Sequence, residues 1–201
     1  MSTRPAATAR RATARVRRAE ARERILAAAE RLLRDRPYRE LSVDAVMTEA
    51  GLSRTVFYRH FDGLPELVLA RLREVAEMLA AEVQVPPGPG RTREVLAAAV
   101  AAFAEHGRFM RAVEEAASHD EDVEAAYRAV VGGFTAQMAG QIQLGMHEGR
   151  IRPGDAYELA RALNHMNRAY LLDTFGRDPS FDRTLALDTL DHVWASVASS
   201  S

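Results

Sequence analysis

The sequence has no cysteine, no lysine and no long hydrophobic run. Without Cys it has neither disulfides nor a thiolate metal site, as is usual in a reducing compartment. The longest wholly apolar run is the ten residues from Val95 to Ala104, about half of what a membrane-spanning helix needs. The basic N-terminus also lacks the apolar segment of a secretory signal. We therefore expect a cytoplasmic protein that has no membrane partner.

No stretch alternates apolar and polar residues as a strand would. Apolar residues recur with helical spacing instead, between Gly, Pro and capping residues. The predicted fold class is all-α, with about nine helices in a small N-terminal three-helix domain and a larger C-terminal helical domain. Helices are expected from Glu23 to before Pro37, as two short helices within 42–61, and over 64–83, 91–105, 108–117, 121–147, 154–176 and 182–198, with a Pro/Gly loop over 86–90.

Charge is divided unevenly along the chain. Residues 1–61 carry 14 Arg and 7 acidic residues, whereas residues 62–201 carry 13 Arg and 21 acidic residues. A basic head on an acidic body suits a protein whose one end approaches a polyanion. Charge alone leaves nucleic acid and an anionic membrane surface both open.

Residues 41–61, LSVDAVMTEAGLSRTVFYRHF, specify two helices at a sharp angle. Ser42 and Ser53 can each cap a helix, and each has an apolar residue before it and another four positions after it. Gly51 ends the first helix where a left-handed backbone is required. Only three residues separate Ala50 from the second helix. This pattern indicates a helix-turn-helix.

The second of these helices, expected over residues 54–61, is short and amphipathic. Phe57 and Phe61 are spaced to anchor one side of it. The other side presents donors and an aromatic ring suited to phosphates and to base edges in the major groove, and a helix N-terminus favours phosphate. The candidate DNA-binding residues are Ser42, Ser53, Arg54, Thr55, Tyr58, Arg59 and His60.

The stretch GLSRTVFYRHF, behind an amphipathic first helix, resembles the N-terminal domain of TetR-family repressors. Gly51, Ser53, Tyr58 and Phe61 match the family's small turn residue, capping Ser, Tyr and closing aromatic. The resemblance covers residues 23 to about 70 and implies binding to double-stranded operator DNA. Leu64 stands where the family often has a phosphate-binding Lys, so the resemblance does not supply that contact.

Residues 162–197, ALNHMNRAYLLDTFGRDPSFDRTLALDTLDHVWASV, are similar to the last two helices of EthR-like (ethionamide-resistance) repressors. The likeness implies a homodimer formed by these helices as a four-helix bundle, and a mostly apolar effector pocket. It thus implies a repressor that a small apolar or amphipathic molecule releases from DNA. The domains we expect are a disordered basic arm over 1–22, a DNA-binding domain over 23–70, and an effector-binding and dimerisation domain over 71–201.

Two side-chain patterns are candidates for the effector site. Large, pliable side chains share one face of the helix 121–147, beside small residues that include Gly133 and allow close approach. Two Asn residues share a face of the next helix and need hydrogen-bond partners where they are buried. Core packing explains the first pattern equally well, and structural pairing the second. With Phe103 and Trp194, which the likeness adds, the candidates are Phe103, Tyr127, Val131, Phe134, Met138, Asn164, Asn167, Leu171 and Trp194.

The sequence gives less support to other classes of function. His106, His119, His147 and His165 lie among carboxylates, but the chain has no catalytic motif and no metal-ligand spacing, so we predict no enzyme, no cofactor and no metal site. Acids that follow His119 are better explained as first-turn residues of a helix. A membrane-surface or protein adaptor that uses the basic arm is the alternative, and it would be indifferent to DNA sequence.

Overall fold

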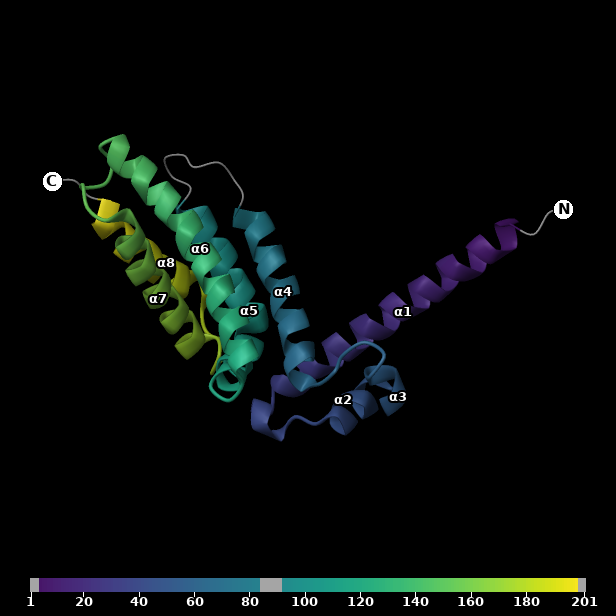
Figure 1. Ribbon diagram of the computed structural model, residues 1–201. Coiled ribbons are helices and arrows are strands. Elements are labelled where there is room, and N and C mark those ends of the chain that lie inside the picture. Colours follow the sequence, from purple (N-terminus) through teal and green to yellow (C-terminus); the bar gives the residue numbers. More distant parts are fainter. Residues whose placement is uncertain (1–3, 84–91, 199–201) are drawn as a thin grey trace. The chain divides into compact units, whose positions relative to one another are not determined.

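The structure is a computed structural model that describes residues 4–83 and 92–198. Every element within these ranges is helical, which confirms the all-α class. No helix there is long and apolar enough to cross a bilayer, and the loop predicted over 86–90 lies outside the described residues. The elements are α1 (Arg4–Leu33), the 3-10 turn η1 (Tyr38–Glu40), α2 (Val43–Ala50), α3 (Arg54–Phe57), α4 (Leu64–Val83), α5 (Thr92–Ala117), α6 (Glu121–His147), α7 (Ala156–Thr174) and α8 (Arg183–Ala198) (Figure 1).

The chain divides into two compact units. The first extends to Arg71 and the second begins at Leu72, so that α4 starts in the first unit and continues in the second. The boundary that we predicted from the sequence falls between residues 70 and 71.

Helix α1 is longer than the sequence predicted. Residues 4–22, expected as a disordered arm, belong to one continuous helix of 30 residues (Figure 1). Ala and Arg make up most of this segment, and both are strong helix formers. The helix therefore forms without the apolar period whose absence led to the prediction of disorder. Its C-terminal half buries Ile25, Leu26 and Leu33 in the core of the first unit.

Gly107 does not interrupt α5, so the predicted break between 105 and 108 is wrong and eight α-helices replace the expected nine in the described residues. Gly107 is buried within the helix. A Cβ atom there would lie 2.9 Å from the carbonyl carbon of Phe175 and 3.0 Å from the amide nitrogen of Gly176. The glycine thus allows α5 to approach the backbone that follows α7, and it serves packing instead of termination.

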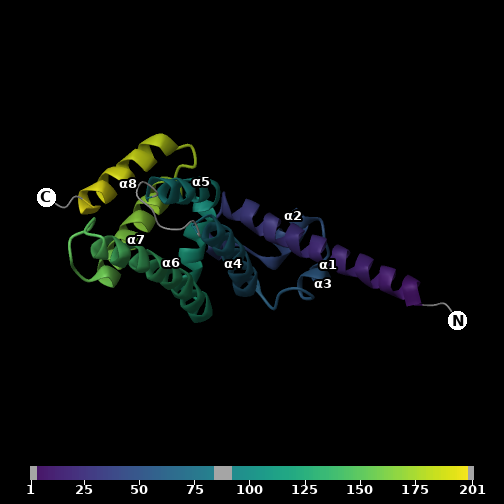
Figure 2. The same ribbon diagram turned by 90° about the horizontal axis from the view of Figure 1, so that it is seen from above.

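In the second unit, α5 contacts α6, α7 and α8, and α6 packs along α7 (Figure 2). Two apolar clusters of described residues contribute to its core. The first joins α5, α7 and α8, and the second joins α6 and α7. The half-buried Trp194 of α8 packs against both clusters. Their buried members are Leu96, Val100, Ala104, Leu171, Phe175, Ala186 and Leu190 in the first, and Ile142, Ala156, Ala160 and Leu163 in the second.

Candidate nucleic-acid interface and effector site

Helix α2 has the predicted residues at both ends. The side chain of Ser42 accepts a hydrogen bond of 3.2 Å from the N–H of Ala45. Gly51 ends the helix with φ 63° and ψ 38°, and its N–H bonds to the carbonyls of Met47 and Thr48. This left-handed backbone favours Gly, because side chains with a Cβ rarely adopt it. The turn between the two helices is therefore fixed by local chemistry.

Helix α3 is shorter than the predicted span of 54–61. It is α-helical only over Arg54–Phe57, and the N–H groups of Arg59 and His60 then bond to carbonyls three residues earlier. So short a segment gains few α-type hydrogen bonds, and its last turn tightens to a 3-10 pattern. Ser53 has the extended backbone of an N-cap, but its side chain makes no capping hydrogen bond. The capping bond predicted for Ser53 is therefore wrong.

The aromatic side of this segment is anchored in the first unit. Phe57 is 0% exposed and Phe61 2% exposed, and their ring centroids are 5.6 Å apart. The guanidinium of Arg22, on α1, lies 5.7 Å from the ring centroid of Phe61. The polar side remains open, since Tyr58 is 50% exposed. Of the predicted DNA-binding residues, Ser42, Ser53, Arg54, Thr55, Tyr58 and Arg59 are exposed and His60 is half-buried.

Arg54 is held by two neighbours. Its Nη1 lies 2.8 and 2.9 Å from the two carboxylate oxygens of Asp44, and its Nη2 donates to the Tyr58 hydroxyl at 3.1 Å. The hydrogen bonds to Tyr58 and Asp44 raise the pKa of Arg54 above its ordinary value, so it stays charged. Asp44, an acid in the first turn of α2, is not among the residues predicted from the sequence.

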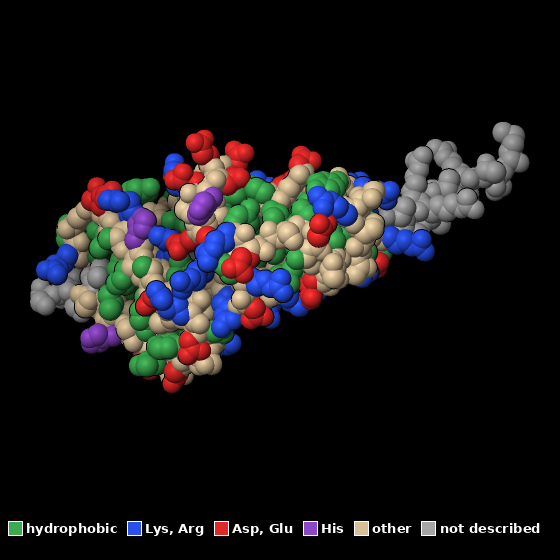
Figure 3. Space-filling model, turned by 90° about the horizontal axis from the view of Figure 1, so that it is seen from below, with side chains coloured by type: hydrophobic (Ala, Val, Ile, Leu, Met, Phe, Trp, Pro, Cys, Tyr) green, Lys and Arg blue, Asp and Glu red, His purple; other side chains and the backbone are tan. Residues whose placement is uncertain are grey.

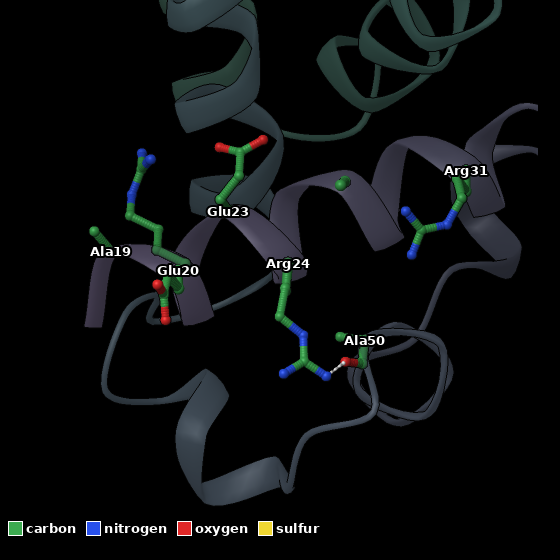
Figure 4. A pocket seen from close by; sticks show the side chains of 8 residues that line it. Ala19, Glu20, Glu23, Arg24, Arg31 and Ala50 are labelled. Carbon is green, nitrogen blue, oxygen red and sulfur yellow. Dashed lines mark hydrogen bonds between the residues drawn. The ribbon is translucent and has the colours of Figure 1, made fainter. Parts of the chain in front are cut away.

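Two arginines of α1 contact the C-terminal end of α2. Arg24 Nη2 donates to the carbonyl of Ala50 at 2.6 Å, and Arg31 Nε pairs with Glu49 at 2.7 Å. Figure 4 looks into the open groove of about 770 Å³ that Arg24, Arg31 and Ala50 help to line. The groove belongs to the first unit and carries charged side chains, so it is distinct from the apolar effector site that the sequence predicts in the second unit.

His60 lies among several of these cations. Its partial burial lowers its pKa below the ordinary value, and the charges of Arg18, Arg22 and Arg59 lower it further. His60 is therefore neutral at pH 7, with one ring nitrogen that donates and one that accepts.

The surface charge does not by itself locate the interface. On the face that Figure 3 shows, Arg side chains are interspersed with acidic and hydrophobic ones. The candidate interface is therefore located by the geometry of individual side chains, and the net charge of the N-terminal part only supports that location.

The predicted effector residue Asn164 connects two helices. Its Nδ2 donates to Thr135 Oγ1 at 2.9 Å and to the carbonyl of Val131 at 3.3 Å. Thr135 is 3% exposed and also donates to the Val131 carbonyl, at 2.9 Å. These bonds hold α7 against α6, as the structural interpretation of this Asn expects. Thr135 was not predicted, because no short-range pattern pairs it with a residue 29 positions later.

Several other effector candidates gather around Trp194. Its Nε1 donates to Asn167 Oδ1 at 3.2 Å, and Asn167 is 8% exposed. Phe103 and Leu171 belong with Trp194 to the cluster of α5, α7 and α8, and Met138 packs with Trp194 against the cluster of α6 and α7. The structure thus brings together candidates from α5, α6, α7 and α8. Phe134, also predicted, is half-buried on α6.

Tyr127 lies in a polar cluster and not in an apolar wall. Its hydroxyl donates to Glu114 Oε1 at 3.2 Å and accepts from Arg168 Nη1 at 3.0 Å, while Arg168 also pairs with Glu114. Burial, together with the charge of Glu114, raises the pKa of Tyr127 to about 12. Arg168 Nε is buried and has no hydrogen-bond partner in the described part of the chain. Glu114 was missed because 54 residues separate it from Arg168.

The acids after His119 have a structural role. Asp120 accepts a hydrogen bond of 3.0 Å from the N–H of Val123 and caps α6. His119 Nδ1 lies 2.7 Å from the Ser118 hydroxyl and 2.9 Å from the carbonyl of Glu115. Within residues 4–83 and 92–198, no group of three or more His, Asp or Glu side chains is placed to hold a metal ion.

Two family models match separate parts of the chain. The model described as "Bacterial regulatory proteins, tetR family" matches residues 25–70, and the model described as "Transcriptional regulator EthR, C-terminal domain" matches residues 92–198. The first match contains the helix-turn-helix, and the second contains α5 to α8.

Known proteins are similar over most of their length. The HTH-type transcriptional regulator EthR of Mycobacterium tuberculosis is 32% identical over 171 residues, which span 81% of this chain and 79% of that protein. A transcriptional regulator from Rhodococcus sp. Rha1 has a TM-score of 0.73 at 19% identity and covers 88% of this chain and 95% of its own. AibR in complex with isovaleryl coenzyme A and operator DNA has a TM-score of 0.69 at 16% identity, with coverage of 86% and 97%.

Proposed function

The chain belongs to the tetR family of bacterial regulatory proteins, and we propose that it represses transcription until a small, largely apolar molecule releases it from its operator. It is a DNA-binding regulator and not an enzyme. The observation that carries the proposal is the division of the segment 54–61 into two sides. Phe57 and Phe61 are buried in the first unit, while Arg54 and Tyr58 remain exposed. A short helix held in this way presents its polar side to the major groove.

The effector would bind in the second unit, near Trp194. Asn167 and Trp194 form a polar pair among the apolar side chains of α5, α7 and α8. A mostly apolar site with a few placed polar groups suits a small, largely apolar molecule. AibR, a protein of the same fold, has been crystallised in complex with both isovaleryl coenzyme A and operator DNA. Ligand and operator would oppose each other here through their linked equilibria.

The working form is a homodimer through α7 and α8. In the dimer, the two copies of the segment 54–61 would contact DNA half-sites that lie about 34 Å apart or a multiple of that distance. Ligand binding in the second unit would change this spacing and so lower the affinity for the operator.

The decisive experiment compares two tyrosines of equal exposure. Tyr58, which directly follows α3, and Tyr157, on α7, are each 50% exposed. An operator is selected from a random duplex library with the full-length wild-type protein, and binding of the variants is measured by fluorescence anisotropy. Tyr58→Ala should weaken operator binding at least tenfold, because it removes a side chain from the DNA-binding surface. Tyr157 lies on one of the two helices proposed to form the dimer, so Tyr157→Ala is compared at a protein concentration at which sedimentation shows it to be dimeric, and there it should bind as the wild type does.

The contrary results are equally clear. Equal operator binding by Tyr58→Ala and the wild type would remove this segment from the interface. Failure of the wild type to select any sequence, together with binding to anionic vesicles, would favour the membrane-surface adaptor.

The effector site is tested through the single tryptophan of the chain. Apolar probe molecules are titrated against the intrinsic fluorescence of Trp194, and each is then tested for release of the operator. Asn167→Leu should alter the concentration of probe needed for release while leaving the affinity of the unliganded protein for DNA unchanged. An identical dose response would return Asn167 to a purely structural role.

A further inference from the structure

An exposed ion pair joins the two helices of the helix-turn-helix. Asp44 lies in the first turn of α2, and Arg54 is the first residue of α3. The Arg54 Nη1 lies 2.8 and 2.9 Å from the carboxylate oxygens, and Nη2 donates to the Tyr58 hydroxyl at 3.1 Å. The guanidinium carbon also lies 5.7 Å from the centroid of the Tyr58 ring. The guanidinium is therefore held from two directions within the surface assigned to DNA.

This pair contributes little to folding. Its side chains are 58% and 69% exposed, and water and salt screen such pairs strongly. Its consequence lies instead in the charge and the position that Arg54 presents to a DNA duplex.

The pairing of Arg54 with Asp44 affects binding to the DNA backbone and binding to the base edges differently. Affinity for any duplex depends on how many phosphates the protein's cations neutralise, whereas discrimination depends on hydrogen bonds of defined geometry to base edges. With a carboxylate beside it, Arg54 adds almost no net charge toward the phosphates of a non-specific duplex. Its position, fixed by Asp44 and Tyr58, still suits a base edge that offers two acceptors.

We propose that Asp44 is a positioning residue that sets DNA specificity: by pairing with Arg54, it weakens binding to non-specific DNA more than binding to the operator. The inference rests on the proposed function, since it takes Arg54 as a DNA contact. An acid in the first turn of a helix also stabilises that helix through its dipole, and the experiment must separate this effect on α2 from the effect on Arg54.

Glu49 provides a matched control. It lies on α2 and pairs with Arg31 of α1 at 2.7 Å, with side chains 39% and 49% exposed. Asp44→Asn and Glu49→Gln therefore each remove one negative charge and one exposed ion pair from the same helix. Only Asp44→Asn releases Arg54.

The measurement is a ratio of affinities. Dissociation constants of the full-length proteins are determined for the selected operator and for a scrambled duplex of equal length, over a range of salt concentrations. Each phosphate contact adds about 0.9 to the steepness of the plot of log affinity against log salt concentration. A tenfold change in salt, from 1 M to 0.1 M, therefore corresponds to about eightfold in affinity per contact. Asp44→Asn should therefore bind the scrambled duplex about three- to eightfold more tightly, with a steeper slope, and bind the operator within about twofold of the wild type. Glu49→Gln should keep the ratio of the wild type.

Two results would overturn the inference. One is an unchanged affinity ratio in Asp44→Asn, and the other is parallel weakening on both duplexes, as expected if Asp44 only stabilised α2. Arg54→Ala identifies which proposal fails. If Arg54→Ala loses the operator and Asp44→Asn keeps the wild-type ratio, only the role of Asp44 is refuted. If Arg54→Ala binds the operator normally, Arg54 is not a DNA contact and the role of Asp44 fails with it, whereas the proposed function fails only if the wild type selects no operator.

Discussion

Replacement of Gly107 by Ala would test the close approach of α5 to the end of α7. The added Cβ would lie 2.9 Å from the carbonyl carbon of Phe175, and 3.0 Å from its oxygen and from the amide nitrogen of Gly176. All three are backbone atoms, so no side-chain rotation can relieve the contacts. Either α5 or the segment after α7 would have to move by several tenths of an ångström.

Two effects of opposite sign determine the result. Overpacking of this kind costs about 1–3 kcal/mol, whereas Ala in place of an interior helical Gly contributes about 1 kcal/mol of helix propensity. We expect Gly107→Ala to lower the free energy of unfolding by about 1 kcal/mol.

Gly133→Ala is the control, since Gly133 is an exposed position of α6 where an added Cβ meets no atom within 4 Å. It should gain the propensity alone, about 1 kcal/mol. A change of 1 kcal/mol moves the melting temperature of a chain of this size by about 2–4 °C. The fluorescence of Trp194, which packs against both apolar clusters of the second unit, reports the transition. We expect Gly107→Ala to melt below the wild type and Gly133→Ala above it.

A rise in melting temperature for Gly107→Ala equal to that for Gly133→Ala would refute the reasoning. It would mean that the backbone after α7 does not press on α5, and that Gly107 has no packing role. The close neighbour that the sequence suggested for the small residues around Gly133 is absent at Gly133 itself, where an added Cβ meets nothing within 4 Å in the described residues.

Three further predictions concern capping, pH and a buried ion pair. Ser42→Ala should destabilise the first unit by about 1 kcal/mol because it removes the cap of α2, whereas Ser53→Ala, which loses no capping bond, should change stability far less in the same urea titration. Tyr127 has its folded-state pKa raised to about 12 from 10.0, so its stabilising contribution is complete below pH 10 and is lost between about pH 10 and 12. Tyr127→Phe should remove roughly 2–3 kcal/mol of that pH dependence, and an identical alkaline melting profile would contradict this. Arg71→Ala removes a hydrogen bond of 2.8 Å and an ion-pair contact of 2.6 Å from a Glu30 carboxylate that is 5% exposed. It should cost about 3–5 kcal/mol and speed amide hydrogen exchange in α1, and unchanged exchange would count against it.

The helix-turn-helix was predictable because its determinants are local. The Ser42 cap spans three residues and the left-handed Gly51 needs only its own backbone. The apolar spacing of Phe57 and Phe61 likewise gave their burial correctly. The length of α3 was wrong because the tightening of a short last turn leaves no mark in composition.

The boundaries of the long helices were predicted correctly in some cases and wrongly in others. The boundaries of α6 and α4 agree with the spacing of apolar residues and with the flanking breakers. Gly107 misled the prediction because an interior glycine that allows close packing is indistinguishable, in one sequence, from a glycine that ends a helix. Residues 4–22 misled it in the opposite sense, since helix propensity there outweighs the lack of an apolar face.

The contacts in the two proposed sites join residues at different separations along the chain, and this difference determines what a sequence can reveal about each site. Asp44 and Arg54 are ten residues apart, so both lie within the single sequence motif of the helix-turn-helix. In the second unit, where we propose the effector site, Asn167 and Trp194 are 27 residues apart, and Glu114 and Arg168 are 54 residues apart. Each of those pairs joins two helices whose contact depends on the whole fold. A substitution in α5 to α8 can therefore change effector chemistry while the DNA-binding pattern stays intact, so effector specificity must be inferred from pairs of residues and not from single positions.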